Sequence, residues 1–205
     1  MALQRWNLTL ISILLLGTVT SGCLSFSQHR LGDIGMLPQP TTGKKPTIAL
    51  DVKVFRDQGN GVEDVGSAGD AQMERLIRAD LDRSGLFSTV LPAGYQSDLR
   101  ADMEIVNRYR KSTARGVLTL ATLALVPTVR SDHFEVTTRF KDAEGNTVGT
   151  IVKAESRSTW VHLFLLVPAL FSSDWTAIGE VMGEIVDSTL IEADAHGLLQ
   201  GTRRS

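Results

Sequence analysis

The chain has 205 residues, of which 42% are hydrophobic and 21% charged, and its formal net charge is −2. These values are typical of one globular domain, and they argue against nucleic acid as a partner because no strongly basic field is present to neutralise phosphates. The single cysteine, Cys23, excludes an internal disulfide.

The first 22 residues are predicted to be an export signal. Arg5 lies near the start, an apolar run covers Leu8–Leu16, and small residues follow from Gly17 to Gly22. A charged segment, a short apolar segment and a small-residue cleavage site together form the pattern of a secretory signal peptide. The apolar run is shorter than the roughly 20 residues of a membrane-spanning helix, which disfavours an uncleaved membrane anchor.

The sequence Thr20-Ser21-Gly22-Cys23 resembles the lipobox of bacterial lipoproteins, although the position three before the cysteine is usually Leu in that family. The resemblance implies that Cys23 carries a diacylglycerol, that the chain is cut before it, and that the new amino terminus is acylated, with palmitate as the expected chain. Such double acylation gives stable membrane anchoring. Leu24 in the next position, in place of Asp, implies delivery to the outer membrane, facing the periplasm. The alternative is a stray thiol behind an ordinary cleavable signal.

Residues 23–46 are predicted to form a flexible tether, because they are rich in Ser, Gln, Thr, Gly and Pro and show little periodicity. A flexible chain of this length spans on the order of 25 Å. A single domain is expected at residues 47–198, and residues 199–205 are expected to be a disordered tail.

The domain begins with strand and helix patterns. Residues 47–55 alternate apolar and polar side chains, as a half-buried strand does. Asp70 is a good N-cap for a helix that Gly85 ends. Short strands are then expected at 87–91 and 102–109.

A hairpin and a second helix complete the predicted fold. Strands are expected at 133–141 and 147–158, joined by a turn at 142–146, so that paired residues have numbers summing to about 289. The closing helix is capped by Ser172 and Ser173 and ends near Ala195. The order of elements predicts an α/β (α+β) fold with two main helices on a mixed sheet of about five strands.

Two segments, 117–127 and 161–171, contain no charged residue. The predicted hairpin register brings both to the same end of the sheet, where they would form one apolar lobe. Three interpretations stay open, namely buried core, an oligomer interface and contact with the membrane that holds Cys23. The candidate contact residues are Leu118, Leu120, Leu123, Leu125, Leu163, Phe164, Leu165 and Leu166.

No pattern of catalytic, cofactor-binding or metal-binding residues is present in the sequence. The four histidines show no metal-ligand spacing, and the phosphate-binding, dinucleotide and nucleophile-elbow motifs are missing. The acids Glu74, Asp80 and Asp82 are expected on the solvent side of the first helix. The chain is therefore predicted not to be an enzyme.

Three stretches carry a further resemblance: Leu81–Val90 at the end of the first helix, Asp98–Asp102 at the entry to the next strand, and Phe140–Gly145 before the hairpin turn. Their pattern is similar to that of the curli secretion channel lipoproteins, the lipoprotein activators of penicillin-binding proteins, and the amino-terminal domain of the Tol translocation protein. The resemblance implies a non-enzymatic module that binds envelope proteins, sometimes as a ring.

Two functions follow from these patterns. The first is a lipid-anchored, periplasm-facing binding or assembly module, with an envelope protein or further copies of itself as partner. The second is an oligomeric component of an outer-membrane secretion or export channel that uses the apolar segments as membrane or subunit contacts.

Overall fold

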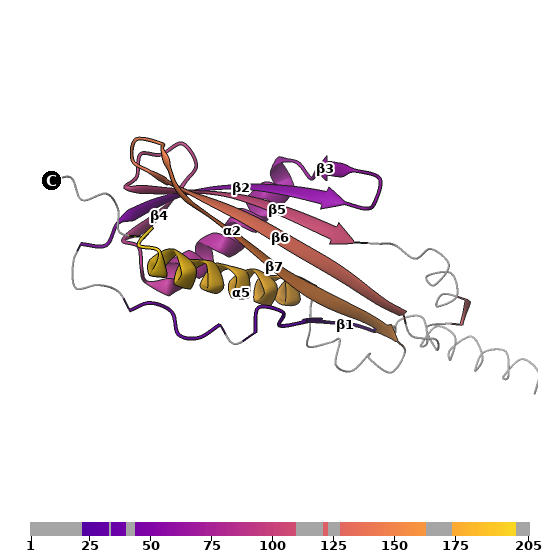
Figure 1. The fold of residues 1–205 in the computed structure, drawn as a ribbon. Helices are drawn as coiled ribbons and strands as arrows, with labels where there is room; N and C mark the ends of the chain where they lie inside the picture. Colours follow the sequence, from indigo (N-terminus) through magenta and orange to yellow (C-terminus); the bar gives the residue numbers. More distant parts are fainter. Residues whose placement is uncertain are drawn as a thin grey trace, which may run out of the picture.

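The structure, a computed structural model, describes residues 22–32, 34–39, 44–109, 121–122, 128–162 and 174–199. Within these residues seven strands form one mixed sheet in the order β1-β7-β6-β5-β2-β3, and β4 also pairs with β2. Two helices, α2 (Ser67–Ser84) and α5 (Asp174–Ala195), pack against this sheet (Figure 1). The predicted α/β (α+β) class with a mixed sheet and two main helices is therefore confirmed.

Five of the strands were predicted, with ends that differ by at most five residues from those in the structure, and β1 and β3 are additional. The strands are β1 (Gly22–Ser27), β2 (Thr47–Asp57), β3 (Val62–Asp64), β4 (Thr89–Pro92), β5 (Leu99–Tyr109), β6 (Thr128–Asp142) and β7 (Thr147–His162).

One face of the sheet forms a hydrophobic core with both helices. Alternate residues of the central strands point into this core, as the period of two in a strand requires. Ile48 of β2 and Ile105 of β5 are fully buried there, and Ile77 of α2 and Ile185 of α5 are equally buried. The same apolar cluster includes residues from both helices, so α2 and α5 cover the same face.

Strands β6 and β7 form the predicted antiparallel hairpin. Paired residues sum to 289 from Thr128 and Val161 to Phe140 and Gly149, which confirms the predicted register. The Asp142 side chain organises the turn by accepting hydrogen bonds from the backbone N–H groups of Glu144 (3.1 Å) and Asn146 (2.8 Å). Hydrogen bonds from Asn146, first of all from its side chain, lower the pKa of Asp142.

The first helix differs from its prediction in two details. Asp70 is not the N-cap, because α2 begins at Ser67 after Gly66. Asp70 instead turns its carboxylate toward β2, where Oδ1 accepts the backbone N–H of Val54 at 2.8 Å. Asp80 is buried and not on the solvent side, since this part of α2 packs against α5. Gly85 ends the helix in the left-handed conformation with φ 65°, as expected.

The amino-terminal segment also differs from its prediction. Residues 22–27, which include the start of the predicted tether, form strand β1 and pair antiparallel with β7. Farther along, Leu31 and Leu37 pack against the hydrophobic core. The start of the predicted tether is thus a strand, and the rest of the tether stays a prediction. Strand β1 was not expected because its six residues are too few for their alternation to stand out.

Several predictions concern residues that the structure does not describe. They are residues 1–21 of the signal peptide, most of the apolar segments 117–127 and 161–171, and residues 200–205 of the tail. Leu199, the first residue of the predicted tail, is buried against the core.

Candidate functional site

Three strands end together at the end of the sheet that includes Cys23. The backbone of Cys23 in β1 pairs with Val161 in β7, and Val161 pairs with Thr128 in β6. Strand β5 stops at Tyr109, opposite Asp132, so β6 continues four residues beyond this last pairing. We call the end formed by residues 22–26, 128–131 and 158–162 the anchor end of the sheet.

Both predicted apolar segments join the sheet at the anchor end. Segment 117–127 leads directly into Thr128, and segment 161–171 begins with the last two residues of β7. The sequence placed the two segments at one end, and the register confirms that placement. All eight candidate contact residues, from Leu118 to Leu166, lie outside the described residues, so the apolar lobe itself stays a prediction.

The sheet face away from the helices is apolar at the anchor end. Trp160 of β7 is 40% exposed, and Val129, its direct partner in β6, is 37% exposed. Neither residue was singled out in the sequence. An apolar pair of this kind on an open face is common in proteins, and it gains significance here from its position beside Cys23.

The opposite face, toward the helices, carries a buried ionic cluster. Asp132 is fully buried, and its Oδ2 accepts a hydrogen bond from Nη2 of Arg157 at 2.6 Å. Its Oδ1 accepts hydrogen bonds from Nη2 of Arg130 at 2.7 Å and from Nε of Arg130 at 3.0 Å. The Arg130 guanidinium also lies over the Tyr109 ring, 4.5 Å from its centroid. Two arginines thus share the carboxylate of Asp132.

Polar contacts dock β1 and the residues that follow it. Ser27 Oγ donates to Glu184 Oε2 of α5 at 2.6 Å, and His29 Nδ1 lies 2.5 Å from Oε1 of the same carboxylate. The backbone N–H of Leu31 donates to the buried Glu155 at 2.9 Å. These contacts fix the position of the amino-terminal segment against α5 and β7, and with it the position of the Cys23 backbone.

An open cleft of about 410 Å³ lies beside the anchor end, at the ends of β2, β5 and β6. Its charged groups compensate each other, because Arg108 Nη1 donates to Glu135 at 2.7 Å and Arg108 Nε lies 3.8 Å from Asp57. His133 Nδ1 is hydrogen-bonded to Ser156 Oγ at 2.8 Å. The cleft therefore offers a mixed polar surface with no dominant charge.

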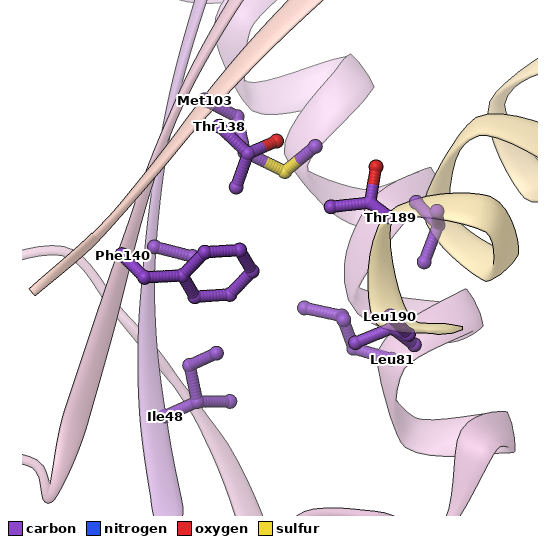
Figure 2. Close-up of a pocket in the computed structure, with 9 residues that line it drawn as sticks. Ile48, Leu81, Met103, Thr138, Phe140, Thr189 and Leu190 are labelled. Carbon is purple, nitrogen blue, oxygen red and sulfur yellow. The ribbon is translucent and has the colours of Figure 1, made fainter. Parts of the chain in front are cut away.

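A second, much smaller cavity of about 10 Å³ lies in the core between the sheet and the helices. Figure 2 shows Phe140 and Ile48 from the sheet facing Leu81 and Leu190 from the helices around it. The cavity has at most the volume of one water molecule, and its walls are apolar, so it has no room for a substrate or cofactor.

The histidines are dispersed through the fold. His196 lies 4.0 Å from Glu192, His29 and His133 have the partners given above, and His162 pairs with Gly22 through its backbone. Across the described part of the chain, no group of three or more His, Cys, Asp or Glu side chains is placed to hold a metal ion. Neither helix among the described residues is long and apolar enough to cross a membrane.

Sequence reasoning missed Trp160, Val129 and the Asp132 cluster. A signal for them exists in the distribution of charge, because residues 105–131 and 156–173 contain no Asp or Glu. Both stretches include strand residues of the anchor end, 128–131 and 158–162.

Comparison with known proteins gives one family. Residues 41–146, just over half of the chain, match the TolB amino-terminal domain. No curated protein matches the sequence. Among solved structures, the chain is similar to the PelC dodecamer from Paraburkholderia phytofirmans, at 12% identity and a TM-score of 0.39, covering 82% of this chain and 97% of that one. It is also similar to a minor lipoprotein from Acinetobacter baumannii, at 12% identity and a TM-score of 0.43, covering 73% and 92%.

Proposed function

The chain belongs to the TolB amino-terminal domain family, and from this membership we propose that it is a lipid-anchored, non-enzymatic module of the bacterial cell envelope that binds or assembles with other envelope proteins. The observation that carries the proposal is the position of Cys23, the predicted lipidation site, within β1 at one end of the sheet. Membership of this family supports a location in the cell envelope, and lipidation would attach the chain to a membrane there.

The pairing of β1 with β7 sets the geometry of the proposed anchor. After cleavage before Cys23 the mature chain would start inside a hydrogen-bonded strand, with no free linker between the lipid and the domain. Each methylene of an acyl chain that enters the bilayer contributes about 0.8 kcal/mol, so two or more chains hold the protein there. The domain would then stand directly on the membrane, with the Leu24 signal directing it to the periplasmic side of the outer membrane.

A second function uses the same end of the sheet. Because both uncharged segments join the anchor end, they would meet either the bilayer or a neighbouring subunit. The chain would then be one subunit of an oligomeric secretion or export component. This alternative requires self-association, whereas the first function requires only a partner protein.

Two experiments test the first function. Mass spectrometry of the mature amino terminus should show an acylated Cys23, and Cys23→Ala should move the protein out of the membrane fraction. Leu24→Asp is the matched control, because it should keep the acyl groups but change the membrane in which an enteric host retains the protein. An unmodified Cys23 in a membrane-free protein would refute the lipid anchor.

Light scattering on the detergent-solubilised acylated protein separates the two functions. A monomer supports the binding module and refutes an obligate oligomeric channel. A stable ring of defined mass supports the channel component. Cross-linking in native envelopes, followed by identification of the attached protein, then names the partner of the module.

A further inference from the structure

The charge of the chain is strongly segregated by position. Three stretches of the sequence that include strand residues of the anchor end, residues 23–32, 105–131 and 156–173, contain seven Lys or Arg and no Asp or Glu. The rest of the chain from Cys23 onward contains all 23 acids and 13 Lys or Arg, a formal charge of −10. The sequence around the anchor end is therefore cationic, and the strand residues 22–26, 128–131 and 158–162 contain Arg130 and no acid.

Pairing within the fold leaves part of this positive charge uncompensated. Arg157 is buried against Asp132, the acid nearest to the anchor end, but Arg130 shares the same carboxylate and keeps 43% of its side-chain surface exposed. Arg110, Lys111 and Arg115 follow β5 directly in the sequence and have no acid within five residues of them. Near a membrane surface, each such cation is attracted to anionic lipid headgroups.

The apolar side chains at the anchor end suit the membrane interface, where lipid headgroups meet acyl chains. Trp160 is half-exposed, and its partner Val129 extends the apolar surface on the neighbouring strand. Tryptophan is enriched at this depth because its ring has an apolar body and a polar N–H. Trp160 lies one register position from Val161, the partner of Cys23, so lipid attached at Cys23 would bring the ring to the headgroup level.

We propose that the anchor end is a second membrane contact, in which Trp160 and Val129 enter the headgroup region of an anionic bilayer and Arg130 binds lipid phosphate. The proposal rests on the lipid anchor at Cys23 and deepens it by fixing an orientation. In this orientation the start of β6 at Thr128 and the end of β7 at His162 face the membrane. The turn at residues 142–146 faces away from it.

Charge also argues against a second copy as the occupant of this surface. Two copies that met through their anchor ends would bring Arg130 of one copy toward Arg130 of the other, with no acid among residues 22–26, 128–131 and 158–162 to offset the repulsion. A bilayer with anionic lipids has the complementary charge.

Tryptophan quenching by brominated lipids tests the contact on the acylated full-length protein. In a Trp175→Phe background, Trp160 is the sole tryptophan of the chain from Cys23 onward. The protein is reconstituted into vesicles of phosphatidylethanolamine and phosphatidylglycerol in which part of the lipid is brominated. We expect Trp160 fluorescence to fall at least about two-fold, because an interfacial ring lies next to the bromine atoms.

The control moves the tryptophan to the far end of the same strand. Val148 is 41% exposed on the same face as Trp160, and the 12 intervening steps of strand place it about 40 Å away. The variant with Trp175→Phe, Trp160→Phe and Val148→Trp should show no quenching by brominated lipid. Equal quenching of both reporters, or a Trp160 that only aqueous iodide quenches, would overturn the proposal.

Arg130 tests the electrostatic part of the contact. Arg130→Gln should lower Trp160 quenching in the anionic vesicles to its level in phosphatidylcholine vesicles, whereas Arg130→Lys should restore it. An unchanged Trp160 signal in folded Arg130→Gln would refute the role of this cation. A Trp160 shielded from lipid and iodide alike indicates a protein neighbour and also overturns the proposal. Failure of the lipid anchor is detected separately, because mass spectrometry would then find no acyl groups on Cys23.

Discussion

Asp132 and Arg157 form an ion pair that is almost completely removed from water, at 0% and 3% exposure. The two residues are direct cross-strand partners in the β6–β7 register, so the pair fixes how the strands lie against each other. Removing two charges from water costs several kcal/mol per ion, and short hydrogen bonds only offset that cost. The pair therefore contributes more to the arrangement of the anchor end than to net stability.

We predict that breaking the Asp132–Arg157 pair costs more than replacing it. Arg157→Leu should lower the free energy of unfolding by about 3 kcal/mol, because it leaves a buried carboxylate with one remaining cation. The double variant Asp132→Leu, Arg157→Leu should recover a large part of this loss. Urea unfolding of the parent, the double variant and both single variants, Arg157→Leu and Asp132→Leu, completes the double-mutant cycle. Additive losses would show that the two charges are not coupled.

The ionised carboxylate of Asp102 makes a contribution to the free energy of unfolding that depends on pH. Burial opposes its ionisation, but hydrogen bonds from Lys141 and Arg100 outweigh burial and hold the pKa of Asp102 below its ordinary value of 3.8. Because the folded-state pKa is the lower one, the stabilisation is complete above the unfolded-state value and is lost as the pH falls through the folded-state value. Asp102→Asn should therefore cost about 1 kcal/mol at pH 7 and progressively less below about pH 4. A difference in unfolding free energy that stays constant from pH 7 to pH 2 would contradict this assignment.

Thr138 places a hydroxyl group in the apolar core beside Phe140 and Met103 (Figure 2). Its Oγ1 is buried and has no hydrogen-bond partner among the described residues. Thr138→Val has nearly the same shape and removes the desolvated hydroxyl, so we expect the free energy of unfolding to rise by about 1 kcal/mol. Thr138→Ser is the matched control: it keeps the hydroxyl, loses the methyl group and should destabilise the protein. A Val variant that melts below the parent would show that the hydroxyl is satisfied in solution.

At the scale of the elements, Asp70 joins α2 to an otherwise open stretch of β2. Strands β3 and β4 pair with the two ends of β2 and leave its middle without a strand partner on that side. Asp70 accepts the Val54 N–H there, and its other oxygen lies 3.0 Å from Lys53 Nζ. The hydrogen bond between Lys53 and Asp70, together with the negative charge of Asp70, raises the pKa of Lys53. A carboxylate thus takes the place of a neighbouring strand.

Replacing Asp70 should therefore destabilise the contact between helix and sheet. Asp70→Ala leaves the Val54 N–H buried without an acceptor, and we expect a loss of about 2 kcal/mol in the free energy of unfolding. Asp70→Asn keeps an acceptor oxygen and should lose less. Hydrogen exchange gives a local readout, since the Val54 amide should exchange faster in Asp70→Ala than in the parent. Identical Val54 protection in both would refute this role.

The elements differ in how well the sequence predicts them. Strands β2 and β5 to β7 bury one face or lead into a defined turn, so the alternation of apolar and polar residues and the turn residues reveal them. The turn at residues 142–146 also predicted the register of the β6–β7 hairpin. β1 and β3 are edge strands of six and three residues, which are too short for a periodic pattern to stand out. The Asp132 cluster was missed because polar residues in a strand indicate a solvent face, whereas here they lie on the sheet face that carries the hydrophobic core. Cys23 was found from its local motif, but its place in a strand depends on a partner more than 130 residues away.

At the scale of the whole molecule, the distribution of core and charge divides the domain in two. The hydrophobic core lies between the central sheet and the two helices, and it includes Ile105 and Val181. The anchor end lies beyond it, where β6 continues past its last pairing with β5, and the buried ion pair of Asp132 and Arg157 borders this end. Such a division lets one part provide folding stability while the other carries the membrane or partner contacts.

This division predicts opposite effects for charges placed in the two parts. Leu120→Asp combined with Leu165→Asp changes both uncharged segments next to the anchor end, and we expect an unchanged unfolding midpoint but weaker association of the acylated protein with vesicles or with further copies. A charged residue in the bilayer interior costs about 3 kcal/mol, so two should lower the association strongly. Ile105→Asp is the matched control in the core and should prevent folding, since an unpaired charge would lie where the parent side chain is fully buried. Thermal unfolding followed by circular dichroism, together with vesicle flotation, separates the outcomes. Loss of folding in the Leu120, Leu165 variant would instead assign the two segments to the core.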